Sequence, residues 1–290
     1  MTPQISIVIP TYNRAYVISR TLNSVLAQSF QDWECLVVDD HSTDNTKEIV
    51  EEYCRADTRF RYLVNEGKKG AQGARNTGIR HAHYDWIQFF DSDDIMHKDL
   101  LVTIIREMER TKYSSDIYTC FSNVIDRNTS QKVNNFEWLC EGNIHDKLFT
   151  RECYVDFNGA VIRKQKLSEI GGLDESCPSM QEWDTHIRLS KVATYHTIPK
   201  TLIDYYIGGE DTISSNSKRE VVGRLYILKK YKKEWRMHKE SHTQYVKEIL
   251  SLIEKNKNHL FRFSATLQLI FYAPFAQWTL IKRYARRMIK

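Results

Sequence analysis

The sequence predicts an α/β fold in which a mostly parallel sheet is flanked by helices. Within the first hundred residues, apolar strand-like runs alternate with segments of helical periodicity, and this alternation is typical of a doubly wound parallel sheet. Polar residues follow the first, second and fourth runs, and ligands bind at the carboxyl ends of the strands in such sheets. The chain of 290 residues is 41% hydrophobic and 12% aromatic, which is enough for one large core and an appendage.

The predicted elements follow one another in a simple order. A β-branched run at residues 5–9 ends at Pro10 and predicts a buried first strand. The next elements are a helix at 18–26, a strand at 33–38, a helix around 49–53, a weaker strand at 61–64, a helix at 74–79 and a strand at 86–90. Later we expect strands at 116–121 and 158–162 and helices at 164–170 and 181–192, whereas residues 123–149 show no clear pattern.

Three carboxylates crowd the end of the fourth strand, at Asp91, Asp93 and Asp94. They repel one another unless a cation lies between them, and hard divalent ions prefer all-oxygen ligands of this kind. The alternative is an acidic turn in which Asp93 or Asp94 caps the helix expected from Leu100 onward. This stretch alone leaves both interpretations open.

The first two strands also end in side chains that suit a nucleotide. Asp40 can accept the N3 hydrogen of uracil, and Tyr12 or Arg14 can lie against a base or a phosphate. The alternative is that Asp39 and Asp44 cap the second helix. The glycine loop after the third strand lacks the G-K-[ST] of a Walker motif, so it is weak evidence for phosphate binding.

Net charge and cysteine content bear on the partners, the metal sites and the cellular compartment that we expect. The net charge of +5, without a basic stripe of stacking aromatics, gives no indication of a nucleic-acid partner. The six cysteines form no C-x-x-C pair, which argues against a zinc site or a thioredoxin motif. Because Met1 leads directly into a strand without a signal peptide, we expect a cytoplasmic protein in a reducing compartment.

Five motifs together resemble those of the family 2 glycosyltransferases of GT-A fold, over residues 4–215. They are IVIPTYNR at 7–14, VVDDHSTD at 37–44, ARNTG at 74–78, DSDD at 91–94 and QEWDTHIRL at 181–189. Five motifs in this order are far more specific than any one of them. The resemblance implies a Rossmann-like sheet and a metal-dependent, inverting transfer of sugar from a nucleotide-sugar.

The resemblance also implies roles for individual residues. Residues that would contact the nucleotide-sugar are Pro10, Thr11, Tyr12, Arg14, Asp40, Arg75, Asn76, Asp91 and Ser92. Asp91 and Asp93 match the family's D-x-D and would hold Mn²⁺ or Mg²⁺, with Asp94 as a further ligand. Glu182 falls where the catalytic base usually is an Asp, and Asp184 is the second candidate for that role.

Two positions depart from the family pattern. Gln181 and Glu182 stand where the family has a Glu-Asp pair, which keeps the carboxylate but lengthens its arm by one methylene. Near Gly209 many relatives carry a histidine that helps to hold metal or diphosphate, and Glu210 or Asp211 are the nearest substitutes. Both departures bear on how the metal is coordinated.

The chain is expected to divide into a catalytic domain, residues 1–217, and a basic, partly amphipathic helical tail, residues 218–290. Residues 263–281 carry no charge over 19 positions, and five basic residues follow them, Lys282, Arg283, Arg286, Arg287 and Lys290. An interfacial helix pair on anionic lipid fits this composition best. Packing on the catalytic domain, a homodimer contact and a membrane span are the alternatives.

The leading hypothesis is an inverting hexosyl- or N-acetylhexosaminyl-transferase at the inner face of the cell membrane. Its donor would be a UDP-sugar, because UDP-sugars are common donors in the family that the chain resembles. Its acceptor would be a hydroxyl of a lipid-linked glycan or polysaccharide, recognised by residues 123–157 and 171–174. The second hypothesis is a non-catalytic nucleotide-sugar or glycan-binding module derived from a glycosyltransferase.

Overall fold

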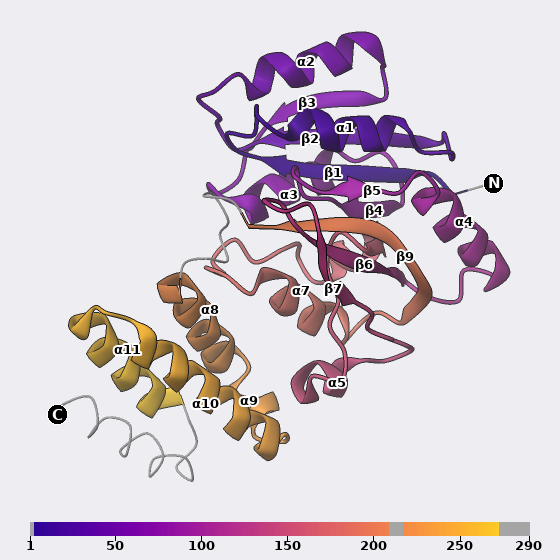
Figure 1. Cartoon of the computed structure of the whole chain (residues 1–290). Coiled ribbons are helices and arrows are strands. Elements are labelled where there is room, and N and C mark those ends of the chain that lie inside the picture. Colours follow the sequence, from indigo (N-terminus) through magenta and orange to yellow (C-terminus); the bar gives the residue numbers. More distant parts are fainter. Residues whose placement is uncertain (1–2, 209–216, 273–290) are drawn as a thin grey trace.

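The computed structural model has a mixed α/β architecture, with one curled sheet between layers of helices (Figure 1). It describes residues 3–208 and 217–272. Within this part of the chain the sheet has nine strands. They are β1 (Ile5–Thr11), β2 (Trp33–Asp39), β3 (Phe60–Val64), β4 (Trp86–Phe89), β5 (Ile95–Met96), β6 (Ile117–Asp126), β7 (Lys132–Phe136), β8 (Ala160–Arg163) and β9 (Tyr195–Ile207).

The first half of the sheet is parallel, as the alternating pattern predicts. Its strands lie in the order β3, β2, β1, β4, and Val8 of β1 pairs with Leu36 on one side and Phe89 on the other. Every residue of β1, β2 and β4 is buried, which explains why these strands are continuous apolar runs rather than alternating ones. The carboxyl ends of β1, β2 and β4 therefore meet at one edge of the sheet.

The second half of the sheet pairs in both directions. β8 is antiparallel to both β4 and β6, and β6 is parallel to β9. β7 is antiparallel to β6, because the turn between them is too short for the crossover that parallel pairing needs. The α/β fold is thus confirmed, and the expected parallel pairing describes its first half.

Helices cover both faces of this sheet. In the described part of the chain they are α1 (Ile18–Leu26), α2 (Thr46–Ala56), α3 (Ala71–His81), α4 (Leu100–Arg110), α5 (His145–Thr150), α6 (Lys164–Glu169), α7 (Gln181–Leu189), α8 (Ser217–Lys230), α9 (Lys232–Trp235), α10 (Lys239–Lys255) and α11 (His259–Tyr272). Apolar residues of α1, α2 and α4 form one core cluster with the sheet. Those of α3, α5, α6 and α7 form a second cluster on the other face.

α3 packs directly on β1 at Gly78. A β-carbon added at this glycine would lie 2.2 Å from Val8 Cγ1, so a larger residue would push the helix away from the sheet. The close contact fixes the position of the helix that carries Arg75 and Asn76.

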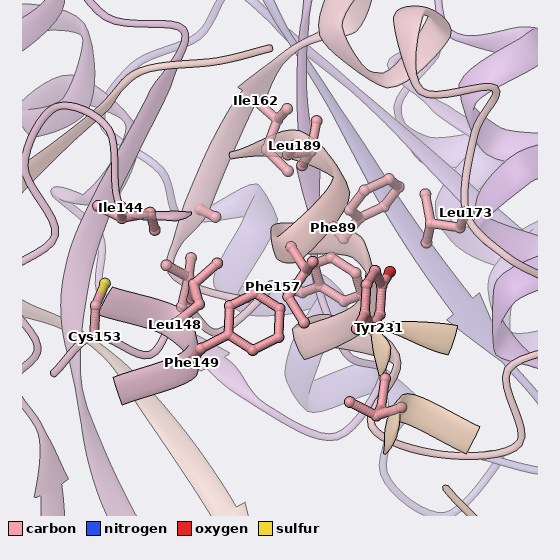
Figure 2. Packing of buried hydrophobic residues seen from close by; sticks show 14 of the residues in the cluster. Phe89, Ile144, Leu148, Phe149, Cys153, Phe157, Ile162, Leu173, Leu189 and Tyr231 are labelled. Carbon is pink, nitrogen blue, oxygen red and sulfur yellow. The ribbon is translucent and has the colours of Figure 1, made fainter. Parts of the chain in front are cut away.

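The tail helices share the second core with the sheet. One apolar cluster extends from Val8 in β1 to Leu269 in α11, and Figure 2 shows Phe149 and Tyr231 close together within it. The ring centroid of Trp235 lies 5.1 Å from that of Phe149. The helices α8 to α11 are therefore packed on the same side of the sheet as α7, which agrees with their place in Figure 1.

α11 contains the first part of the uncharged run. Its residues Ala265, Thr266 and Leu269 are buried, and the helix lies against α8 and α10. This face of α11 is thus packed on the other tail helices, whereas the alternative stated for the run was packing on the catalytic domain. Within residues 3–208 and 217–272, no helix is both long and apolar enough to cross a membrane. The rest of the run and the basic residues after it lie outside the described residues.

Cys140 and Cys153 form a disulfide, and their Cα atoms are 5.7 Å apart. The expectation of a reducing compartment gave no reason to pair any cysteines, and a separation of 13 residues matches no motif. The pairing comes from the tertiary structure, because the chain between β7 and β8 folds back on itself around α5. The segments that precede α5 and follow it are therefore joined covalently.

Candidate active site

The carboxylates at the end of β4 are in contact with two arginines. Arg75 Nη2 donates to Asp91 Oδ1 at 2.7 Å, and Arg127 Nη2 donates to Asp93 Oδ2 at 2.9 Å. Burial raises the pKa of Asp91, the charge of Arg75 lowers it, and the charge of Asp93 raises it again. Asp91 and Asp93 thus form an anionic centre that is stabilised by positive charge.

Asp94 has different surroundings. Its Oδ2 accepts a hydrogen bond from Asn158 Nδ2 at 2.6 Å, and its Oδ1 accepts one from the backbone N–H of Tyr206 at 2.7 Å. Asp94 is 1% exposed, and burial, followed by the charges of Asp91 and Asp93, raises its pKa well above the usual range. Asp94 therefore joins the end of β4 to the segment before β8 and to β9.

The alternative interpretation, in which Asp93 or Asp94 caps the following helix, is wrong. α4 begins at Leu100 and its N-cap residue is Asp99. The short strand β5, which pairs with β9, lies between the carboxylates and the helix.

The chemistry of Asp91 and Asp93 fits a divalent cation. Two carboxylates that repel each other gain from a shared cation, and Mg²⁺ is commonly held by one or two carboxylates together with substrate phosphates. Among the residues that the structure describes, no three His, Cys, Asp or Glu side chains gather closely enough to hold an ion by themselves. Asp91 and Asp93 therefore suit an ion that is held jointly by their carboxylates and by a bound diphosphate.

Glu182 lies in the first turn of α7 and interacts with the same arginine. Burial raises the pKa of Glu182, the charge of Arg75 lowers it, and the charge of Asp91 raises it. The Arg75 side chain is 4% exposed, so its ion pair with Asp91 is sheltered from water. The charge of Arg75 thus acts both on the carboxylates at the end of β4 and on a separate carboxylate of α7.

Asp156 is a further carboxylate of this site, and no motif pointed to it. Burial, followed by the charges of Asp91 and Glu182, raises the pKa of Asp156 to about 7. Its Oδ2 is buried without a hydrogen-bond partner. Asp156 comes from a segment without clear periodicity, so only its place near the disulfide and before β8 brings it to the site.

Asp184 faces the tail helices instead. It is 1% exposed, and its Oδ1 accepts hydrogen bonds from Tyr231 Oη at 2.7 Å and Lys230 Nζ at 2.6 Å. Arg188 Nε lies 3.3 Å from its other oxygen. Two positions along a helix correspond to a rotation of about 200°, which explains why Glu182 and Asp184 point to opposite sides of α7.

The loops after β1 and β2 are tied together by hydrogen bonds. The N–H of Asn13 donates to Ser42 Oγ at 2.9 Å, and the N–H of Ala15 donates to Asp44 Oδ2 at 3.0 Å. Tyr12 is 42% exposed at the start of the first loop. Its ring is therefore open to a ligand at the edge where these strands end.

The two acidic residues expected as helix caps differ from each other. Asp44 Oδ1 accepts a bond at 3.0 Å from the N–H of Thr46, the first residue of α2. Asp39 accepts bonds from the N–H of Ser42 and from the hydroxyl of Tyr62. Asp39 thus supports the loop. The N-cap residue of α2 is Asn45, so neither Asp39 nor Asp44 is the cap, although Asp44 bonds the first turn of the helix from the position before it.

Asp40 holds the glycine loop. Its Oδ1 accepts a bond from Asn65 Nδ2 at 2.6 Å, and its Oδ2 accepts one from the N–H of Gly70 at 2.8 Å. A carboxylate can accept more than two hydrogen bonds, so these contacts leave Asp40 able to accept a base N–H. Pro10 and Thr11 end the neighbouring strand, and the hydroxyl of Thr11 is buried without a partner.

Asn76, which follows Arg75 on α3, forms hydrogen bonds with the loop that precedes α7. Its Nδ2 donates to Leu173 O at 2.9 Å and to Glu175 Oε1 at 2.7 Å, and its Oδ1 accepts from the N–H of Leu173 at 2.8 Å. Asn76 thus fixes the loop that leads into α7. Ser92 is also buried, in the turn after Asp91.

Arginines from three segments surround the carboxylates. Arg14 lowers the pKa of Asp91, and Arg20 Nη2 donates to the backbone oxygen of Asp93 at 3.1 Å. The motifs indicated Arg14 but neither Arg20 nor Arg127, because neither Arg20 in α1 nor Arg127 in the turn before β7 lies in one of the five motifs. Guanidinium groups in this arrangement suit the oxygens of a diphosphate.

The segment around Gly209, where many relatives carry a histidine, lies outside the described residues, as do Glu210 and Asp211.

Comparison with known proteins identifies the family. The model of glycosyl transferase family 2 matches residues 6–171, which is more than half of the chain. The chain belongs to glycosyl transferase family 2. The family resemblance is thereby confirmed, and four of the five motifs lie within the matched residues.

Among curated proteins, the chain is similar to two named glucosyltransferases and to a chondroitin synthase. It is 26% identical to the GalNAc(5)-diNAcBac-PP-undecaprenol beta-1,3-glucosyltransferase of Campylobacter jejuni, over 82% of this chain and 77% of that protein. It is 48% identical to the UDP-Glc:alpha-D-GlcNAc-diphosphoundecaprenol beta-1,3-glucosyltransferase WfgD of Escherichia coli, over 31% of this chain and 35% of that protein. The match with Escherichia coli chondroitin synthase spans 30% of that protein.

Solved structures establish the GT-A fold for this family 2 member. The structure of S. aureus TarS 1-349 in complex with UDP-GlcNAc has a TM-score of 0.68 at 20% identity, covering 93% of this chain and 82% of that one. The mannosyltransferase PcManGT of Pyrobaculum calidifontis, in complex with GDP-Man and Mn²⁺, has a TM-score of 0.65 at 14% identity, covering 100% and 81%.

Proposed function

We propose that this family 2 member transfers a hexosyl or N-acetylhexosaminyl unit, with inversion, from a nucleotide-sugar to a hydroxyl group. The observation that carries the proposal is that Arg75 and Arg127 donate to Asp91 and Asp93 at the carboxyl end of β4, at 2.7 and 2.9 Å. The charge of Arg75 also lowers the pKa of Glu182 in the first turn of α7. An anionic pair that attracts a cation therefore lies near a separate, partly buried carboxylate. Inverting transfer needs one base and no carboxylate nucleophile.

In the proposed reaction, the acceptor hydroxyl oxygen attacks C1 of the donor sugar. The bond from C1 to the phosphate oxygen breaks, its electron pair leaves with the nucleoside diphosphate, and the hydroxyl proton passes to Glu182. A raised pKa makes Glu182 a better proton acceptor near neutral pH, and a positioned general base contributes roughly 10²- to 10⁴-fold in rate. The charge of Arg75 lowers that pKa, which helps to keep Glu182 ionised and ready to accept the proton.

The donor end of the site supports a nucleoside diphosphate. Asp91 and Asp93 would hold Mn²⁺ or Mg²⁺, which when bound stabilises the charge on the leaving diphosphate. Arg20 and Arg127 lie beside Asp93 and are suited to donate to phosphate oxygens. Asp94 has no part as a metal ligand in this proposal, because it is 1% exposed and its pKa is raised well above the usual range by burial and by the charges of Asp91 and Asp93, which favours the protonated form.

We propose UDP as the nucleotide, with Asp40 accepting from the base and Pro10, Thr11 and Tyr12 lining its pocket. Support comes from the names of relatives, because WfgD is named for UDP-Glc and the TarS structure contains UDP-GlcNAc. The competing nucleotide is GDP, which the PcManGT structure contains as GDP-Man. An aspartate can pair with the N1–H and N2–H₂ of guanine as well as with uracil.

We propose a lipid-linked glycan as acceptor, because two relatives are named for undecaprenol diphosphate acceptors.

The tail supports a place at the cytoplasmic membrane surface. The outward face of α11 carries Leu260, Phe263, Leu267 and Phe271, which recur every three or four residues as on one side of a helix. Basic residues beyond residue 281 follow in sequence, and each adds on the order of 1 kcal/mol on anionic lipid.

The first test is thermal stabilisation of the whole chain by UDP, GDP, CMP or dTDP, each with and without Mn²⁺. A rise in the unfolding midpoint with UDP that needs Mn²⁺ is the expected result. A rise with GDP alone would replace the donor but keep the reaction. No rise with any of the four would reject the nucleotide-sugar site.

The competing hypothesis is a non-catalytic binding module. UDP release from UDP-Glc, UDP-Gal, UDP-GlcNAc and UDP-GalNAc, with an alkyl diphosphate-linked GlcNAc as acceptor, separates the two. The wild type should release UDP with at least one donor and the Glu182→Gln variant should not. Release no faster than the protein-free background by both proteins with every donor, while UDP still binds, would establish the binding module.

A further inference from the structure

A shallow recess lies beside the carboxylate site, between β6 and the segments before and after α5. It is open to solvent, and its lining includes Ser122, Phe136, Trp138, Tyr154 and Asp156. None of the five family motifs contributes to it. Phe136 and Trp138 come from residues 123–149, which show no clear pattern, and Thr119 and Cys120 come from the strand expected at 116–121.

We propose that this recess binds one pyranose ring of the acceptor, a proposal that rests on the proposed glycosyl transfer. The rings of Trp138 and Tyr154 would lie against the C–H face of the sugar, and Asp156 would accept a hydrogen bond from one of its hydroxyls. Asp156 is then a positioning residue for the acceptor, and Glu182 remains the base.

The composition of the recess favours a sugar over a wholly apolar ligand. Trp138 is 41% exposed and Tyr154 is 38% exposed, so two amphipathic rings are open to a ligand at the same place. Asp156 Oδ2 is buried and has no hydrogen-bond partner, and such an acceptor is costly unless a ligand donor reaches it. A pyranose offers an apolar C–H face to the rings and hydroxyl donors at its edge.

The aromatic side chains are held in place before any ligand arrives. The ring centroid of Phe136 lies 6.2 Å from that of Tyr154 and 5.8 Å from that of Tyr205. The disulfide between Cys140 and Cys153 joins the segment that carries Trp138 to the segment that carries Tyr154. Pre-ordered contacts of this kind reduce the entropy that binding must overcome.

Two observations place the recess on the acceptor side of the site. Asp156 Oδ1 accepts a hydrogen bond from the N–H of Asn158 at 3.3 Å, and Asn158 Oδ1 accepts one from the N–H of Asp91 at 2.7 Å, so a sugar held by Asp156 lies beside the carboxylate site. Arg14 and Asp40, which are assigned to the donor, do not line the recess. A ring bound there would therefore be the sugar that receives the transferred unit.

The test is saturation-transfer NMR with the methyl glycosides of glucose, galactose, GlcNAc and GalNAc. The whole chain is used, with UDP and Mn²⁺ in excess to occupy the donor site. At least one glycoside should give a signal, and Trp138→Ala or Asp156→Asn should lower that signal by roughly tenfold, the loss expected when an anchoring contact is removed. Trp138→Phe should restore part of it.

Leu139→Ala is the matched control, because Leu139 is 60% exposed next to Trp138 but does not line the recess. It should bind the glycoside as the wild type does. The proposal is overturned if no glycoside binds the wild type, if the signal survives in both Trp138→Ala and Asp156→Asn, or if Leu139→Ala loses it equally. A signal that appears only without UDP would identify a donor-sugar site instead.

A kinetic measurement separates this proposal from the proposed function. Trp138→Ala should raise the acceptor KM roughly tenfold and leave the donor KM and the slow hydrolysis of donor by water unchanged. Turnover with an unchanged acceptor KM would reject the recess and keep the transferase. Glycoside binding that depends on Trp138 in a protein without turnover would keep the recess and reject the transferase.

Discussion

Glu182 and Asp184 stand two positions apart on α7, yet they have separate surroundings. Glu182 interacts with Arg75 and Asp91, whereas Asp184 accepts hydrogen bonds from Lys230 and Tyr231. The difference predicts that one carboxylate serves the reaction and the other serves the packing of the tail.

Glu182→Gln should lower kcat by roughly 10²- to 10⁴-fold, the usual contribution of a general base, and leave UDP affinity and the unfolding midpoint close to wild type. Asp184→Asn should lower the free energy of unfolding by about 1 to 3 kcal/mol, because a buried ion pair loses its charge. UDP-release kinetics, calorimetric UDP binding and urea unfolding measure these effects. The reverse pattern would assign the base to Asp184.

Asp156 should make the stability of the protein depend on pH. Its pKa is about 7 in the folded protein and about 3.9 in an unfolded chain, so between these values the folded state binds more protons. The contribution of the protonated group is complete below pH 4 and is lost as pH rises through 7, by up to about 1.4 kcal/mol per pH unit for one proton.

Asp156→Asn should remove that loss. Urea unfolding with EDTA at pH 5 and pH 8 should show the variant gaining stability relative to wild type at the higher pH. Glu182, Asp91 and Arg75 also act on this group, so Glu182→Gln measured in parallel separates their part. A difference between Asp156→Asn and wild type that does not change with pH would contradict the raised pKa.

At the residue scale, the sequence indicated those groups that belong to motifs. Asp91, Asp93 and Glu182 were found because each follows or begins a regular element. Asp156 and Arg127 were missed because their segments have no periodicity, and only the pairing of β6 with β7 and β8 brings them to the site. No local signal in the chain marks such residues.

At the scale of elements, α11 has two unlike faces. Ala265 and Leu269 are buried against the neighbouring helices, whereas Phe263 and Phe271 are 66% and 73% exposed. Replacing Phe263 by Glu should lower binding to phosphatidylglycerol vesicles at least about tenfold, since it removes apolar contact and adds a repelled charge.

Vesicle sedimentation at low and high salt measures this binding, with phosphatidylcholine vesicles for comparison. Gln268→Glu is the matched control, because Gln268 is exposed on the flank of the same helix and the substitution adds the same charge. Equal loss in both variants would mean that charge alone decides the binding. Absence of binding by the wild type would reject a membrane surface as the partner.

The elements differ in how well the sequence predicted them. The strands β1, β2 and β4 were evident because burial on both faces gives continuous apolar runs. β7 was not, because three of its five residues are exposed and its residues are mostly polar. The antiparallel pairing of β8 also left no trace in its short apolar run, since a buried strand looks the same in either direction.

At the scale of the whole molecule, the proposed division at residue 217 separates two proposed functions. It does not separate two hydrophobic cores. Trp235 and Tyr245 of the tail belong to the same apolar cluster as Phe149 and Val8. A chain that ends at residue 217 would therefore expose that cluster. We expect residues 1–217 alone to lack a cooperative thermal transition, which circular dichroism of the purified fragment would measure.

The matched control for this truncation is a chain that ends at residue 272, the last described residue, which keeps all of the tail helices in the core. It should unfold cooperatively like the full chain. A sharp transition for residues 1–217 at nearly the temperature of the full chain would show that the tail is an independent appendage. Composition alone predicted an appendage, because it cannot tell that the apolar faces of the tail helices and the sheet belong to one core.

The contact of Asp184 with Lys230 has a geometric consequence for the acceptor. This ion pair joins α7, which carries Glu182, to α8, the first of the described tail helices that lead to α11. If α11 rests on lipid, the height of Glu182 above the bilayer is a fixed dimension of the molecule. The protein would then select acceptors by length. Glycans whose reactive sugar reaches that height would be used, and shorter or longer glycans would not.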